Sequence, residues 1–139
     1  MLDDKDMKIV GHLRSHARDS IRDIAKATHL RPSTVHQRLV LLEKEKVIEY
    51  YTAKLNNEAV QEGFLVFLWI TTTQDLLPSF FHNPFVKEVF GITGEYDLLI
   101  KLKFPSLKEF NAYLIALRKN KIITKTLTQV VTITLKETL

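Results

Sequence analysis

The chain has no cysteine, which excludes a disulfide framework and any metal site built from thiolates. It also has no long apolar run: the longest, Phe64 to Ile70, has seven residues, whereas a membrane-spanning helix needs roughly 20. The acidic start, Met1 to Asp6, is not followed by an apolar stretch, so a secretory signal peptide is not expected. These absences favour a soluble protein of the reducing cytoplasm.

Acidic residues are missing from one stretch in the first half of the chain. None lies between Asp23 and Glu43, whereas Lys26, Arg31 and Arg38 fall inside this interval. The whole chain carries a net charge of +4, which permits a polyanionic partner without requiring one. An ordinary solvated surface explains this pattern equally well, so charge alone does not identify the partner.

Helical patterns dominate the first 44 residues. Asp3 or Asp4 can cap a first helix, and Ser20 with Asp23 forms a weaker version of a capping box at the start of a second. The side chains expected on the inner faces of these two helices are apolar: Met7, Ile9, Val10, Leu13, Ile21, Ile24 and Ala25. Two short amphipathic helices are therefore predicted before residue 30.

A third helix is predicted over about Pro32 to Lys44, because proline already has a helical φ and suits the first turn. Its inner stripe would be Val35, Leu39 and Leu42. Its outer face would carry Ser33, Thr34, His36, Gln37 and Arg38. A helix that is merely soluble usually mixes Glu with Lys on such a face. A DNA-binding helix-turn-helix is therefore favoured over a three-helix bundle that binds nothing.

The second half changes to the two-residue period of β-strands. The expected elements, in chain order, are a linker strand at 47–54, strands at 63–73, 85–93, 98–104 and 124–135, a short helix near 76–81, and a helix capped by Ser106. Residues 55–139 then have the order β-α-β-β-α-β, which predicts an α+β, ferredoxin-like sandwich. Residues 1–54 form the helix-turn-helix domain with its linker strand.

Such a sheet is covered by helices on one side only. Its other face must stay in water or pair with a second subunit. The large side chains of Phe67 and Trp69 on the long strand favour pairing, so a homodimer is expected.

The ordered set of motifs resembles the Lrp/AsnC, or feast/famine, family of transcription regulators. The resemblance rests on Leu2-Asp3-Asp4-Lys5-Asp6, Ile24-Ala25, Ser33-Thr34-Val35, Arg38-Leu39, Leu42-Glu43, Tyr51-Thr52-Ala53, Gly94-Glu95-Tyr96-Asp97 and Thr126-Leu127-Thr128. It implies a DNA-binding head and a ligand-sensing, self-associating tail (a RAM domain). The chain departs from the family pattern at His29 and Lys46, where glycine is usual, and at Arg31, where a Ser or Thr cap is usual.

The DNA hypothesis assigns two roles to the predicted contact residues. Arg38 could bind a guanine and Gln37 an adenine, each through two hydrogen bonds, with Ser33, Thr34 and His36 also near the bases and backbone. Arg22, Lys26 and Arg31 are candidates for phosphate contacts. The alternative for Arg38 is an ion pair with Glu43 or with a carboxylate of the first helix. A dimer would favour a near-palindromic operator, and assembly into tetramers or octamers stays open.

The resemblance also implies that a small effector, often an amino acid, binds between tail domains near the Gly94-Glu95-Tyr96-Asp97 turn. The residues that match are Gly94, Tyr96 and Asp97, with Thr126 and Thr128 as wall residues. The alternative is structural: Asp97 ties down its own turn and Tyr96 packs at an interface.

Two rival functions differ in what they require. A structural DNA-coating protein would use the same head without sequence preference. Some tetrapyrrole decarboxylases share the two-domain resemblance, and the histidines or Tyr96 could be proposed as acids. No paired carboxylates, nucleophile–base spacing or phosphate loop is present, and His36 has no second ligand at metal-binding spacing. We therefore expect neither an enzyme nor a bound metal or cofactor, apart from the effector.

Overall fold

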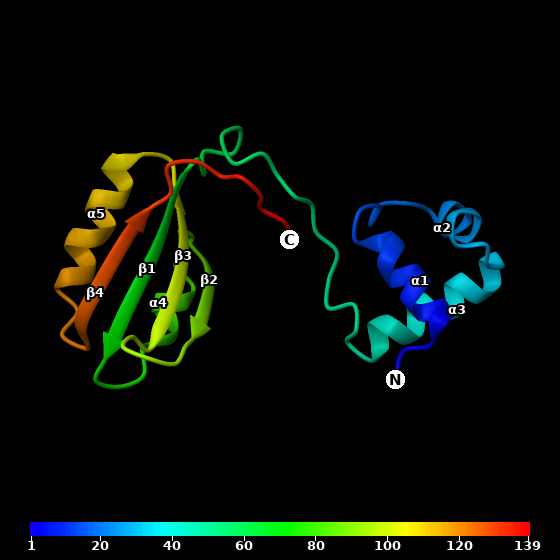
Figure 1. Ribbon diagram of the computed structural model, residues 1–139, viewed down its shortest axis with the longest axis horizontal. Helices are drawn as coiled ribbons and strands as arrows, with labels where there is room; N and C mark the ends of the chain where they lie inside the picture. Colours follow the sequence, from blue (N-terminus) through cyan, green and yellow to red (C-terminus); the bar gives the residue numbers. More distant parts are fainter. The chain divides into compact units, whose positions relative to one another are not determined.

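The computed structural model describes all residues from Met1 to Leu139. The chain divides into two compact units, Met1–Ala53 and Lys54–Leu139 (Figure 1). The first is helical, and the second is built around a β-sheet. The change of period in the sequence therefore corresponds to a change of architecture.

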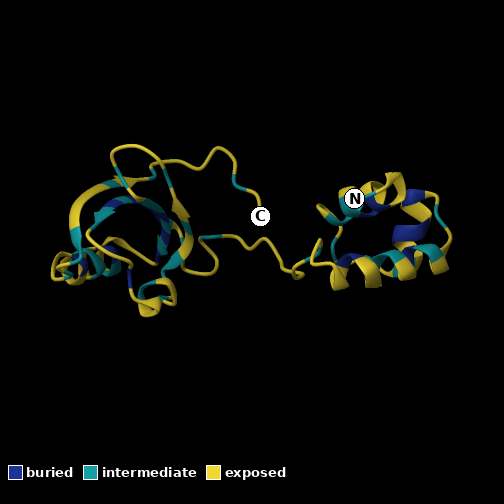
Figure 2. Cartoon of the chain, turned by 90° about the horizontal axis from the view of Figure 1, so that it is seen from below, coloured by how far each residue is buried: buried dark blue, intermediate teal, exposed yellow.

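The N-terminal unit contains the three predicted helices, α1 (Asp4–Leu13), α2 (Ile21–Thr28) and α3 (Pro32–Lys44). Figure 2 shows buried residues gathered on the inner sides of these helices and exposed residues outside. The buried core consists of Ile9, Ile24, Ala25, Val35 and Leu42. Met7 was expected to lie with this core, but its residue is 56% exposed. That prediction is wrong, because Met7 falls at the edge of the apolar stripe and no other helix covers it.

The turn between α2 and α3 confirms that histidine can replace the usual glycine. His29 caps α2 in the left-handed region at φ 57° and ψ 36°, and its N–H donates to the carbonyl oxygen of Ala25. Arg31, which replaces the usual Ser or Thr cap, occupies the N-cap of α3 and supplies no side-chain hydrogen bond there. Lys46, at the second departure from glycine, has φ 60°. These local conformations keep the helix-turn-helix intact despite the changed residues.

The linker strand predicted at 47–54 is absent, and no other strand occurs between the end of α3 and Phe64. Its β-forming residues have no neighbouring strand with which to share backbone hydrogen bonds. The Tyr51 hydroxyl instead donates to a carboxylate oxygen of Glu43 at 2.8 Å. Partial burial, together with this carboxylate, raises the pKa of Tyr51 to about 12.

The C-terminal unit has the predicted β-α-β-β-α-β order. Its elements are β1 (Phe64–Thr72), α4 (Pro78–Phe81), β2 (Val86–Gly91), β3 (Leu98–Phe104), α5 (Leu107–Arg118) and β4 (Ile123–Val130). The four strands lie in the order β2-β3-β1-β4, and every neighbouring pair is antiparallel. This topology confirms the ferredoxin-like sandwich. The last strand ends at Val130 instead of Leu135, because beyond it only the N–H of Val131 still donates to β1.

The two faces of the sheet have different partners. The face under α4 and α5 is buried and apolar. Together with residues of α5 and of the loop after β1, it forms one cluster of Val66, Leu68, Ile70, Leu76, Ile100, Leu102, Phe104, Phe110 and Leu117. The outer face carries the alternate residues of the same strands, among them the half-buried Phe67 and Trp69 and the lysines Lys101 and Lys103. The prediction of a sheet covered by helices on one side is therefore confirmed.

Candidate functional site

The exposed side of α3 presents part of the predicted DNA-contact set. Ser33, His36 and Gln37 are exposed, and none forms an ion pair or a side-chain hydrogen bond within the chain. Thr34 is only half-buried, so it lies at the flank of this face. A missing side-chain cap at Arg31 also leaves the first N–H groups of α3 without a side-chain acceptor. Polar groups and helix-terminal N–H donors thus lie together at the start of the helix, where an anionic partner is favoured.

The three predicted phosphate contacts are free cations on the surface. Arg22 and Lys26 lie one helical turn apart on α2, and Arg31 lies just before α3. All three are exposed, and no carboxylate lies within ion-pair distance of any of them. Their positive charge is therefore available to a partner outside the chain.

Arg38 differs from the rest of the predicted set, because its guanidinium is already bound. It donates to a carboxylate oxygen of Asp3 at 2.5 Å and to one of Asp6 at 3.1 Å. The backbone N–H of Asp6 and the guanidinium lower the pKa of Asp3, and the two carboxylates raise the pKa of Arg38. Of the two roles left open by the sequence, the structure shows the ion pair with the first helix. The sequence offered a carboxylate of the first helix only as the alternative, although Arg38 lies three residues after Val35 and four before Leu42 and therefore shares their buried side.

In the tail, Asp97 ties its turn to β1. Its side chain accepts from the N–H of Thr72 at 2.9 Å, and its own N–H donates to the carbonyl oxygen of Ile70 at 2.9 Å. Gly94, in the same turn, has φ 108°, a backbone conformation that residues with a side chain rarely adopt. The structural role foreseen as the alternative for Asp97 is therefore present.

The other predicted effector residues do not share one cavity. The Tyr96 ring lies 6.2 Å from that of Trp69, and the Lys125 ammonium lies 4.9 Å from the Tyr96 centroid. Thr126 and Thr128 instead line a cavity of about 210 Å³ against α5. Tyr96 does not line this cavity, and Lys125, which does, lies between the two places.

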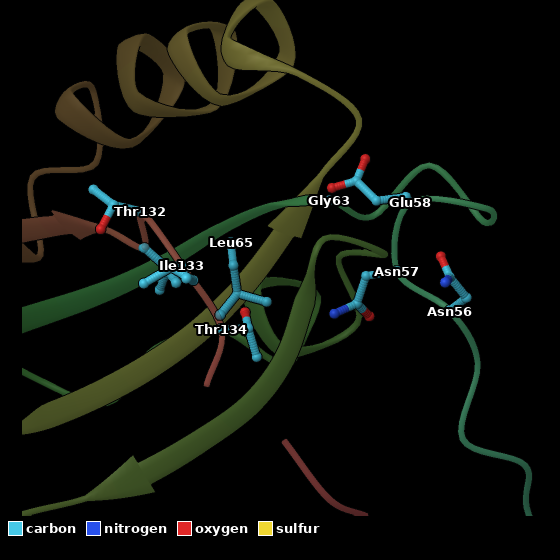
Figure 3. Close-up of a pocket in the computed structure, with 9 residues that line it drawn as sticks. Asn56, Asn57, Glu58, Gly63, Leu65, Thr132, Ile133 and Thr134 are labelled. Atoms are coloured by element: carbon cyan, nitrogen blue, oxygen red, sulfur yellow. The ribbon is translucent and has the colours of Figure 1, made fainter. Parts of the chain in front are cut away.

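A cavity that sequence reasoning missed lies beside the C-terminal segment. It has a volume of about 350 Å³ and is lined by Asn56, Asn57, Glu58, Gly63, Leu65 and residues 131–134 (Figure 3). Figure 3 shows Leu65 and the side chains of this final segment on one side and the Asn56–Glu58 turn on the other. The last residues of the chain therefore fold back onto the first residues of the same unit.

Glu137 fixes that final segment through an ion network on the outer face of the sheet. Its carboxylate lies 2.6 Å from the Lys101 ammonium and 3.2 Å from those of Lys103 and Lys54. The Asn57 amide donates to it at 3.0 Å. The lysines, Lys101 foremost, and this amide hold the pKa of Glu137 far below its usual range. The only sequence signal was the pair of lysines at alternate positions of an otherwise apolar strand.

Two further kinds of site are absent from the structure. None of the helices has the length and hydropathy of a membrane span. No three His, Cys, Asp or Glu residues are grouped so that they could hold a metal ion.

A helix-turn-helix unit with an open polar face, joined to a ferredoxin-like unit, defines a two-domain DNA-binding transcription regulator. Residues 2–43 match the AsnC-type helix-turn-helix domain, and residues 65–139 match the Lrp/AsnC ligand binding domain. The chain belongs to the Lrp/AsnC family, as its motifs indicated.

Curated relatives cover nearly the whole chain. The HTH-type transcriptional regulator FL11 of Pyrococcus horikoshii is 30% identical over 99% of this chain and 93% of its own. FL11 of Pyrococcus furiosus is 32% identical over 82% of this chain and 78% of its own. These relatives are named as transcription regulators.

Solved structures have the same fold. A transcriptional regulator from Neisseria meningitidis, solved as a complex with L-Met, superimposes with a TM-score of 0.92 at 24% identity, covering 99% of this chain and 94% of its own. The feast or famine regulatory protein from M. tuberculosis, complexed with L-methionine, has a TM-score of 0.87 at 24% identity, covering 99% and 96%. At this level of identity the likeness establishes the architecture alone.

Proposed function

We propose that the chain is a sequence-specific transcriptional regulator, not an enzyme, that acts in the cytoplasm by placing α3 in the major groove of DNA. The observation that carries this proposal is the exposed face of α3, where Ser33, His36 and Gln37 have no partner within the chain. Gln37 has the amide geometry to donate to and accept from one adenine edge. Ser33, Thr34 and His36 lie near enough in the helix to contact neighbouring bases or phosphates.

Positive side chains beside α3 would supply the affinity that does not depend on sequence. Arg22, Lys26 and Arg31 are exposed and unpaired, so phosphates can bind them without breaking an internal ion pair. Contacts of this kind fix the register of a protein on the duplex, while base-edge contacts choose the sequence. Arg38 was also predicted to contact DNA at this surface. Its guanidinium is bound to Asp3 and Asp6, so a contact with a base would require it to leave these carboxylates.

The experiment that tests this proposal is selection of bound duplexes from a random pool with the full chain. We expect one near-palindromic motif, because a homodimer would present two copies of α3 about one DNA turn, roughly 34 Å, apart. Gln37→Ala should relax the preference at one base pair by about 1–3 kcal/mol while keeping the salt dependence. Binding to every duplex with equal affinity would contradict the proposal and favour the DNA-coating alternative.

Self-association is proposed through the outer face of the sheet. Phe90, Trp69 and Leu127 lie there half-buried or exposed, next to Phe67 and Leu99, with no helix over them. Apolar side chains gathered in this way are more common at interfaces than on the surface of a monomer. Light scattering on wild type and Trp69→Glu tests the assignment: we expect a dimer that the charge dissociates, and an unchanged mass would contradict it.

An amino-acid effector is proposed for the C-terminal unit. The match to a ligand binding domain supports it, and two proteins of the same fold were solved with L-methionine. The predicted residues are Gly94, Tyr96, Asp97, Thr126 and Thr128. Tyr96 lies beside Trp69, whereas Thr126 and Thr128 line the cavity against α5, so the predicted residues give two candidate places for the effector. Calorimetry with the twenty amino acids tests this, and uniformly no heat would remove the effector while leaving DNA binding intact.

A further inference from the structure

Arg38 lies on the wrong side of α3 to share the exposed face with Gln37. Successive residues of a helix are rotated by about 100°, so Arg38 is turned away from Gln37 toward the side of Val35 and Leu42. Both of these residues are buried, at 0% and 2% exposed. The Arg38 side chain itself is 28% exposed. Its position on the helix therefore directs it toward α1 and not outward.

The Arg38 guanidinium completes a closed set of hydrogen bonds at the start of α1. Asp3 and Asp6 form a capping box, in which one carboxylate oxygen of each accepts from the backbone N–H of the other, at 2.9 and 3.0 Å. The remaining oxygen of each carboxylate accepts from Arg38. All four oxygens are thus used, two for the cap and two for the ion pair.

If the Arg38 guanidinium left to contact DNA, the two carboxylates would lose their only cation. Two neighbouring carboxylates would then share one helix terminus without a cation, and the Asp6 side chain is only 10% exposed. A partly buried charge that loses its partner raises the free energy of the folded state. Arg22, Lys26 and Arg31 carry no such penalty, because they have no internal partner to leave.

We infer that Arg38 is a positioning residue, which fixes the rotation of α3 against the capped end of α1 and so aims Gln37 and His36, instead of contacting a base itself. The inference rests on the proposed role of α3 in DNA binding. It makes Asp3 and Asp6, far from any expected base, as important for affinity as Arg38. Loss of the pair would let α3 rotate, which would weaken every base contact together and leave their order of preference unchanged.

The test compares Arg38→Gln, Asp6→Asn and the double variant in the full chain, on the duplex most enriched by the wild type. Asparagine keeps an oxygen that can accept from the Asp3 N–H, so Asp6→Asn removes the Arg38–Asp6 ion pair, leaves the Arg38–Asp3 pair and spares the cap. We expect each single variant to lose about tenfold in affinity for the duplex. The double variant should lose no more affinity than the single variant that binds less tightly, because the residues form one network. Base preferences at all operator positions should stay as in the wild type. Gln37→Ala is the matched control, and it should relax one position only.

Two results on DNA would overturn the inference. One is a preference lost at a single base pair in Arg38→Gln while Asp6→Asn binds as the wild type does. The other is unchanged affinity in both single variants. A thermal melt of each variant, followed by circular dichroism, ensures that affinity is compared well below the melting temperature.

A readout without DNA separates this inference from the proposed function. In the full chain we expect Arg38→Gln and Asp6→Asn to shift the amide resonances of the same α3 residues, including His36 and Gln37, in the same direction. Unchanged α3 resonances would overturn the positioning role, even if the wild type bound no duplex at all.

Discussion

The two units contain ion networks of opposite composition. In the N-terminal unit one cation, Arg38, lies between two carboxylates, and in the C-terminal unit one carboxylate, Glu137, lies among three lysines. The Asp3 and Arg38 side chains are 50% and 28% exposed, whereas those of Glu137, Lys101 and Lys103 are between 10% and 13% exposed. Each network has one exception, Asp6 at 10% and Lys54 at 39%. Ion pairs gain or lose more free energy where water is excluded. The comparison indicates that the N-terminal network orients a helix, while the C-terminal one holds a segment in place.

The largest expected effect is that of Glu137→Gln, which leaves three ammonium groups facing one amide. We expect the free energy of unfolding of the C-terminal unit to fall by roughly 2 kcal/mol, less than the 3–5 kcal/mol typical of a fully buried pair. Trp69, the only tryptophan and part of this unit, allows urea unfolding to be followed by fluorescence. The matched control is Glu95→Gln, since Glu95 pairs with Lys125 on the exposed surface. A change below about 0.5 kcal/mol is expected there, and equal losses in both variants would remove the contrast between buried and exposed pairs.

Acid should destabilise the wild-type C-terminal unit through the same carboxylate. The pKa of Glu137 is lowered in the folded state, so its stabilisation is present above its ordinary pKa of 4.5. This contribution is lost as the pH falls below that value toward the lowered pKa. Urea unfolding monitored by Trp69 fluorescence at several pH values between 7 and 3 gives the profile. The Glu137→Gln variant should show a flatter profile, and an identical slope in the two proteins would contradict this role of Glu137.

A smaller effect is expected for the stability of the N-terminal unit. Asp6→Asn should lower its free energy of unfolding by about 1 kcal/mol, because a charge-assisted hydrogen bond to Arg38 is lost and Asp3 still pairs with it. Helical circular dichroism during urea unfolding measures this change. If Asp6→Asn lowered the free energy of unfolding by more than Glu137→Gln does, the N-terminal network would be the more stabilising of the two, contrary to this prediction.

Salt should produce the smallest difference. At about 1 M salt the Debye length falls to about 3 Å, which weakens exposed pairs more than buried ones. We expect the effect of Asp6→Asn on stability to shrink by a few tenths of a kcal/mol, because its partner Arg38 is 28% exposed. The effect of Glu137→Gln should stay nearly constant, because Lys101 and Lys103 are only 13% and 12% exposed. Repeating both unfolding series at low and high salt checks the difference, and equal shrinkage would mean that both networks are equally hydrated.

Local signals in the sequence were sufficient for most of the fold. Pro32 placed the start of α3, and the alternating pattern with the Ser106 cap placed the sheet and α5. Contacts between distant residues could not be predicted in this way. The Asn57–Glu137 pair spans 80 positions and leaves no periodic trace. The Arg38–Asp3 pair spans 35 positions, and the sequence offered a pair with the first helix only as an alternative.

Three errors have a common physical cause. Arg38 was assigned to the exposed face of α3 by its polarity, although its spacing from Val35 places it on the buried side. The residues of 47–54 have β propensity, but no neighbouring strand is present to pair with them. Met7 was grouped with the core by its apolarity, although nothing packs over it. In each case the position of a residue was predicted from its type, whereas its place on the helix or the presence of a neighbouring element determines that position.

The left-handed conformation of His29 offers an opening for protein engineering. An L-residue with a Cβ atom pays a steric cost at φ 57° that glycine does not. His29→Gly would relieve this cost without touching the exposed face of α3 or either ion network, for a gain of up to about 1 kcal/mol. A sturdier background of this kind would let destabilising variants be compared at one temperature while all of them remain folded.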